Sequence, residues 1–158
     1  MRYNKHMPSS RHGMTLIEIL IAITLVVLTA GIGLLALNPV GQLAAARNSE
    51  RKLQLQGIIQ AVRQNITDTT TGVFSCPSAG ALPTSTPKIM GSASGNYNIA
   101  PCLTILQTMP FDPLASSSYY NSNVDYNTGY TIVYNTSTTQ ITVAAPYAEL
   151  GKSVSITR

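Results

Sequence analysis

One carboxylate interrupts a long apolar segment near the start of the chain. Glu18 is the only charged residue between Met14 and Leu37. A carboxylate inside a membrane-spanning helix costs roughly 3 kcal/mol on insertion-based scales, and it is usually matched to a partner. The apolar segment contains no Lys, Arg or His that could act as this partner. The position of Glu18 therefore calls for a cation that the intact segment does not supply.

Cleavage of the chain between Gly13 and Met14 would create such a cation. The new α-amino group would have a reference pKa of about 7.7–8.0, so it would be largely protonated at neutral pH. Glu18 follows Met14 by four residues, and we expect both to lie on one face of a helix. The helix macrodipole also favours an anion at this end. The carboxylate could then neutralise its own terminus or that of a neighbouring copy.

The apolar segment is long enough to span a membrane. At 1.5 Å per residue, residues 14–37 can cross a hydrocarbon layer of about 30 Å. Arg2, Lys5 and Arg11 precede the segment and the next charge after Glu18 is Arg47, which predicts a cytoplasmic N-terminus and an exported C-terminal part. A secretory signal peptide would have a shorter apolar region, of about 7–15 residues. A plain membrane anchor explains the length but gives no reason for Glu18.

The string GMTLIE at residues 13–18, followed by the apolar segment, resembles the class III signal of type IV pilins and type II secretion pseudopilins. In that family a prepilin peptidase removes a short basic leader ending in glycine, and the new N-terminus is methylated. The resemblance implies a leader at residues 1–13, cleavage after Gly13 and N-methylation of Met14. The family usually has Phe at the first mature position, so Met14 departs from the pattern and puts the efficiency of methylation in question.

The resemblance also implies a function. A single-pass membrane precursor would be trimmed, extracted from the lipid at an inner-membrane assembly platform, and packed with copies of itself into a cell-surface filament. Glu18 would pair with the Met14 ammonium of a neighbour. Adhesion, motility, DNA uptake and secretion machines all use subunits of this design. The alternatives are a major pseudopilin of a type II secretion system and an anchored extracytoplasmic binding module that keeps residues 1–13 and does not polymerise.

The charge distribution argues against nucleic acid as a general partner. The chain has 10 basic and 6 acidic residues. Three of the basic residues, Arg2, Lys5 and Arg11, lie in the leader, so 7 basic residues remain against 6 acidic ones. The basic excess thus belongs to the leader, and nucleic acid is expected as a partner only in a DNA-uptake pilus.

The second helical segment should support a soluble head. We divide the chain into the leader (1–13), a membrane or filament-core helix (14–38), an amphipathic half of the same helix (39–66) and a head (67–158). A kink or a short melted stretch is expected near Gly31, Gly33 and Pro39, with the helix continuing beyond it. Apolar residues recur at helical spacing at Leu55, Ile58, Ile59, Val62 and Ile66. The basic cluster Arg47, Arg51, Lys52 and Arg63 is interpreted as a solvated helix face.

The head is predicted to end in antiparallel strands. Residues 67–101 are rich in Thr, Ser, Gly and Pro and indicate a loop. Residues 129–134 and 140–145 predict a hairpin, and residues 153–158 predict a third strand. The fold class is therefore α+β, with a long N-terminal helix packed on a small antiparallel sheet, as in type IV pilins.

The remaining candidate residues point to structure rather than to catalysis. Cys76 and Cys102 would form a disulfide in an exported head and stay two buried thiols in a cytoplasmic one. Asp112 and Asp125 are weak candidates for calcium, because this ion needs six to eight oxygen ligands. Both histidines lie in the leader, the acidic residues are scattered, and the sequence has no nucleophile motif. We expect no enzyme activity and no cofactor.

Overall fold

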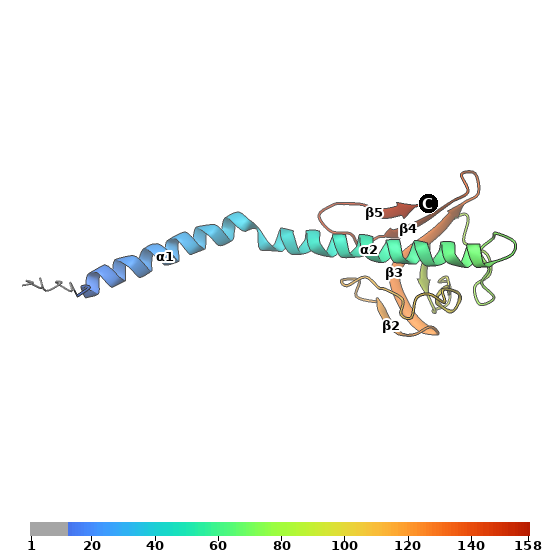
Figure 1. Ribbon diagram of the computed structural model, residues 1–158, viewed down its shortest axis with the longest axis horizontal. Coiled ribbons are helices and arrows are strands. Elements are labelled where there is room, and N and C mark those ends of the chain that lie inside the picture. Colours follow the sequence, from blue (N-terminus) through green and yellow to red (C-terminus); the bar gives the residue numbers. More distant parts are fainter. Residues whose placement is uncertain (1–12) are drawn as a thin grey trace, which may run out of the picture. The chain divides into compact units, whose positions relative to one another are not determined.

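The computed structural model describes residues 13–158, apart from the side chains of residues 34–37 (Figure 1). The predicted leader, apart from its last residue Gly13, lies outside this range. The described residues fall into two compact units that divide after Pro39. The first contains helix α1 (Leu16–Leu37), and the second contains nearly all of helix α2 (Pro39–Asp68) together with the head.

Apart from Glu18 and two threonines, the described side chains of helix α1 are apolar or glycine. Its large aliphatic side chains between Leu16 and Ile32 are exposed, and the window Leu16–Gly33 is long and apolar enough to cross a membrane. Two threonines interrupt this surface, and each hydroxyl donates to a backbone carbonyl in the preceding turn: Thr24 to Leu20 at 2.7 Å and Thr29 to Leu25 at 2.9 Å. These bonds satisfy polar groups that lipid could not.

A break at Asn38 separates α1 from α2, within the region where a kink or short melted stretch is expected. Asn38 ends α1 in the left-handed conformation, with φ 41°. Asparagine tolerates this conformation better than most residues with a side chain. Pro39 is then the first residue of α2, a position where its missing N–H costs nothing.

Helix α2 buries the predicted apolar stripe. Leu55, Ile58, Ile59 and Val62 are at most 3% exposed, and Ile66 packs against the same core. The stripe extends further toward the N-terminus of α2 than predicted, because Ala44, Asn48 and Arg51 are also buried.

The sheet is antiparallel and has five strands. They are β1 (Lys88–Gly91), β2 (Tyr119–Ser122), β3 (Asp125–Asn135), β4 (Gln140–Ala145) and β5 (Val154–Thr157). The order is β1-β3-β4-β5, and β2 pairs with the N-terminal part of β3. The α+β fold class, the β3–β4 hairpin and the third strand are confirmed. Strands β1 and β2 were not predicted, and β1 lies inside the segment expected to be a loop.

One hydrophobic core joins α2 to the sheet. Alternate residues of the hairpin face inward, and Tyr130, Ile132 and Val143 are fully buried. They form one cluster with Leu55 and Ile58 of α2. Figure 1 shows α2 crossing the sheet, with β2 on one side of the helix and β5 on the other.

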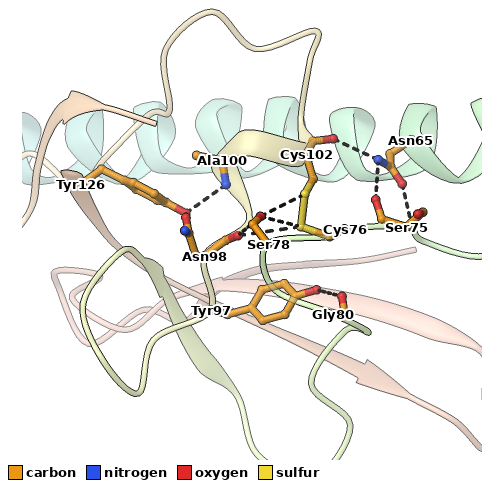
Figure 2. Close-up of a disulfide and its surroundings, with 10 residues drawn as sticks. All are labelled: Asn65, Ser75, Cys76, Ser78, Gly80, Tyr97, Asn98, Ala100, Cys102 and Tyr126. Carbon is orange, nitrogen blue, oxygen red and sulfur yellow. Dashed lines mark hydrogen bonds between the residues drawn. A yellow bond between two sulfur atoms is a disulfide. The ribbon is translucent and has the colours of Figure 1, made fainter. Parts of the chain in front are cut away.

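A disulfide closes the loop between α2 and the sheet. The structure joins Cys76 to Cys102, which are separated by 26 positions (Figure 2). Beside it, the Asn65 side-chain amide donates to the carbonyls of Ser75 and Cys102, both at 3.0 Å. The disulfide therefore fixes the loop 77–101 close to the last turns of α2.

Reducing this disulfide should destabilise the head. The chain-entropy model gives a loss of about 3–4 kcal/mol in the free energy of unfolding for a closed loop of this length. Urea denaturation of residues 40–158, with and without reductant, measures the change. A variant with both cysteines replaced by alanine serves as the control, because reductant should not affect its stability. Equal stability of the oxidised and reduced wild-type head would contradict the prediction.

Candidate functional site

The N-terminus of α1 brings the processing and charge residues together. Gly13 and Met14 precede the helix and are exposed, and Thr15 is the N-cap. The Thr15 hydroxyl accepts a hydrogen bond from the Glu18 backbone N–H at 3.3 Å, and the Thr15 carbonyl accepts from the same N–H at 3.1 Å. Glu18 is thus the third residue of the helix.

This geometry corrects the expected placement of Met14. The helix begins at Leu16, so Met14 lies before the N-cap and does not share a helical face with Glu18. The sequence carried a signal for this, since Thr15 and Glu18 have the Ser/Thr-x-x-Glu spacing of a capping box. A carboxylate in the first turn also interacts favourably with the macrodipole. The charge of Glu18 therefore has a local stabilising role in addition to any role in pairing.

The Glu18 carboxylate is left without a side-chain partner within residues 13–158. None of the ion pairs among these residues involves it, and its neighbours Ile17 and Ile19 are exposed apolar side chains. In a lipid or helix-packed environment this carboxylate would be desolvated and would need a cation or hydrogen-bond donor from elsewhere.

A second polar cluster lies inside the head, around Arg51. This side chain is fully buried, which corrects its assignment to a solvated helix face. Its guanidinium donates two hydrogen bonds to the Asp112 carboxylate: Nε to Oδ2 at 2.8 Å and Nη2 to Oδ1 at 2.9 Å. Nη1 donates to Asn48 at 2.8 Å and to Glu149 at 2.9 Å. A sequence signal existed, because Arg51 is four residues before Leu55 on the buried stripe.

Glu149 connects the loop before β5 to two arginines of α2. Arg47 donates to its carboxylate through Nε at 2.8 Å and through Nη2 at 2.6 Å. Asn48 adds a backbone contact, since its amide donates to the Glu149 carbonyl at 2.9 Å and accepts from the Glu149 N–H at 3.0 Å. Asp112 and Glu149 are far apart in the sequence, but both form ion pairs with Arg51 of α2.

The pKa shifts agree with paired carboxylates. Burial would raise the pKa of Asp112, but hydrogen bonds from Arg51 and from the backbone N–H groups of Leu114 and Ala115 lower it below its usual value. The hydrogen bonds from Arg47, with a further contribution from Arg51, lower the pKa of Glu149 to about 2. Both acids are therefore ionised at neutral pH, and the cluster acts as a structural clamp.

The two acids considered as calcium ligands, Asp112 and Asp125, accept hydrogen bonds from different partners. Both oxygens of Asp112 accept hydrogen bonds from Arg51, and Oδ1 also accepts from Leu114 N–H. Asp125 is exposed and accepts from the Tyr119 hydroxyl and the Asn121 amide, both at 2.9 Å. Asp112 therefore does not fit a calcium ligand. Residues 13–158 contain no group of three or more His, Cys, Asp or Glu that could hold a metal.

Comparison with known proteins gives one match. Residues 8–34 match the model of the prokaryotic N-terminal methylation motif, which is the class III signal of the type IV pilin and pseudopilin family. No curated protein and no solved structure matches the chain. The matched residues include Gly13, Met14 and Glu18 and most of α1. The motif and this apolar helix fit a membrane-anchored precursor that is processed by a prepilin peptidase.

Proposed function

We propose that the chain is the precursor of a structural filament subunit. The chain is cleaved after Gly13, methylated at the new amino group of Met14 and assembled with copies of itself into an extracellular filament of the type IV pilus kind. The observation that carries this proposal is the methylation motif at residues 8–34, which overlaps a helix long and apolar enough to cross a membrane.

The exposed surface of α1 requires two successive environments. Before assembly, lipid covers its aliphatic side chains, and afterwards the α1 helices of neighbouring copies do so. Glu18 is the residue that distinguishes these states, because a buried charge without a partner costs several kcal/mol and a matched pair recovers much of that. The Met14 ammonium of a neighbour is the proposed partner, so the pair would set the register between adjacent helices.

The proposed subunit depends on other proteins for processing and assembly. A prepilin peptidase and its N-methyltransferase activity would process the precursor with its N-terminus in the cytoplasm, and an inner-membrane platform would extract it. The subunit itself would have no enzyme activity. Its head would reach the cell surface, where an oxidising environment supports the Cys76–Cys102 disulfide. Nucleic acid would bind only if the filament serves DNA uptake.

The motif is common to pilins and pseudopilins, so a major pseudopilin of a type II secretion system is the alternative within the same class. An anchored binding module that does not polymerise is the alternative outside it. The two classes differ in the fate of the leader, because the anchored module keeps residues 1–13.

Mass spectrometry of the N-terminus tests the proposal. Filaments sheared from cells should contain a subunit that begins at Met14 with one added methyl group. In Gly13→Ala the peptidase should fail to cut, and the full-length precursor should remain in the membrane. A sheared fraction without this protein, or a wild-type subunit that keeps residues 1–13, would contradict the proposal.

A further inference from the structure

The flank of α2 that faces β2 carries an open groove with one carboxylate in it. This acidic groove has a volume of about 450 Å³ and is lined by Glu50 together with Met109, Pro110, Phe111 and Tyr120. Phe111 is 41% exposed although it is aromatic. The Glu50 carboxylate accepts one hydrogen bond, from Gln54 Nε2 at 3.0 Å, and takes part in none of the ion pairs among residues 13–158. The groove thus combines an exposed aromatic ring with an acid that forms no ion pair within the described part of the chain.

The opposite flank of α2, facing β5, carries the opposite charge. A second open groove, of about 290 Å³, is lined by Gln60, Arg63, Ile156 and Arg158. Within the described part of the chain neither arginine of this basic groove takes part in an ion pair. Tyr120 of β2 lines the first groove and Ile156 of β5 lines the second, and Figure 1 shows β2 and β5 on opposite sides of α2. The two grooves therefore flank α2 on opposite sides.

These charges cannot neutralise each other within one copy. Arg63 follows Glu50 by 13 residues, which corresponds to about 20 Å along the helix and about 140° around it. In two neighbouring copies with parallel α2 helices, a relative shift of about 20 Å would bring Glu50 of one opposite Arg63 of the other. The apolar side chains Phe111 and Ile156 beside the two charges would partly exclude water from this contact.

We propose that the head domains of neighbouring copies contact each other through these grooves. The acidic groove of one copy faces the basic groove of the next, and Glu50 of the first pairs with Arg63 of the second. The occupant of each groove is therefore a second copy of this chain. Because the two surfaces differ, the contact is heterologous, and such contacts build rings or open helical filaments rather than two-fold dimers. This inference rests on the proposed function and adds a specific contact between heads to it.

Charge reversal tests the contact. Glu50→Arg alone sets arginine against arginine, and Arg63→Glu alone sets glutamate against glutamate. Each single variant should lower the yield of sheared filaments at least tenfold. The double variant Glu50→Arg/Arg63→Glu restores opposite charges and should recover the yield to within about twofold of wild type. Co-expression of the two single variants should also recover it, because copies that alternate would pair correctly.

Matched controls separate this contact from general effects of charge. Asp68→Arg and Lys88→Glu make the same charge changes at exposed residues outside both grooves, and they should assemble like wild type. Equal amounts of cleaved subunit in the membrane fraction show that each variant folds and is processed. Normal filaments from either single variant, or no recovery in the double variant, would overturn the contact while leaving the proposed function intact. A wild-type protein that does not polymerise would overturn both.

Discussion

Replacing Asp112 by alanine is expected to lower the free energy of unfolding of the head by about 3–5 kcal/mol. The change removes the bidentate partner of Arg51, whose side chain is fully buried in the core face of α2. The guanidinium would keep its contacts with Asn48 and Glu149 but lose two of its hydrogen bonds. A buried charge with too few partners is among the costliest single defects in a protein. Urea denaturation of residues 40–158 measures the loss.

Two further variants show whether the buried charge is the cause. Asp125→Ala makes the same chemical change at an exposed acid, and its effect should stay within about 0.5 kcal/mol. Arg51→Met combined with Asp112→Asn removes both charges and keeps an acceptor for the Leu114 N–H, so it should cost less than Asp112→Ala alone. A loss below about 1 kcal/mol in Asp112→Ala would show that the ion pair does not stabilise the head.

The Arg51 cluster also shows where sequence reasoning stopped. Helical periodicity places Arg51 on the buried stripe, but its charge favoured the solvated face, and this interpretation was wrong. The burial is tolerated because Asp112 and Glu149 supply acceptors from positions 61 and 98 residues further along the chain. Spacing within α2 cannot reveal such partners, since they depend on how the sheet folds back on the helix.

The strands were predictable where the side-chain pattern was strong. The β3–β4 hairpin has alternating apolar residues and two predicted runs of the right length, and it was found. Strands β1 and β2 have only four residues each, KIMG and YYNS. Each forms because β3 offers a partner edge, so the signal lies in the tertiary pairing and not in the strand itself.

Two features of the sequence at the start of α1 bear on the role of Glu18. The sequence interpretation linked Glu18 to Met14, and the residues do lie in the matched methylation motif. It did not use Thr15, although the spacing of Thr15 and Glu18 predicts an N-cap three residues before the acid. Glu18 therefore has two candidate roles, stabilising the helix N-terminus through the macrodipole and pairing with a neighbour. They predict different results on mutation.

Glu18→Ala is expected to insert into the membrane and to lose filament assembly by at least tenfold. Alanine is apolar and a strong helix former, so α1 should still form and enter the lipid. The packed state, however, would lack the carboxylate that the proposed pairing requires, and a neighbour's Met14 ammonium would be buried without its counter-charge. The yield of sheared filaments and the amount of cleaved subunit in the membrane fraction give the two readouts.

Two matched variants distinguish pairing from capping. Thr15→Ala removes the hydroxyl that accepts the Glu18 N–H but keeps the charge, and losing such a cap costs only about 0.5–2 kcal/mol. Glu18→Gln keeps the size and polarity of the side chain but removes the charge. If pairing is the role of Glu18, Thr15→Ala assembles and Glu18→Gln does not. If stabilising the helix N-terminus explains the residue, Thr15→Ala is at least as damaging as Glu18→Ala, and the argument that Glu18 sets the register fails.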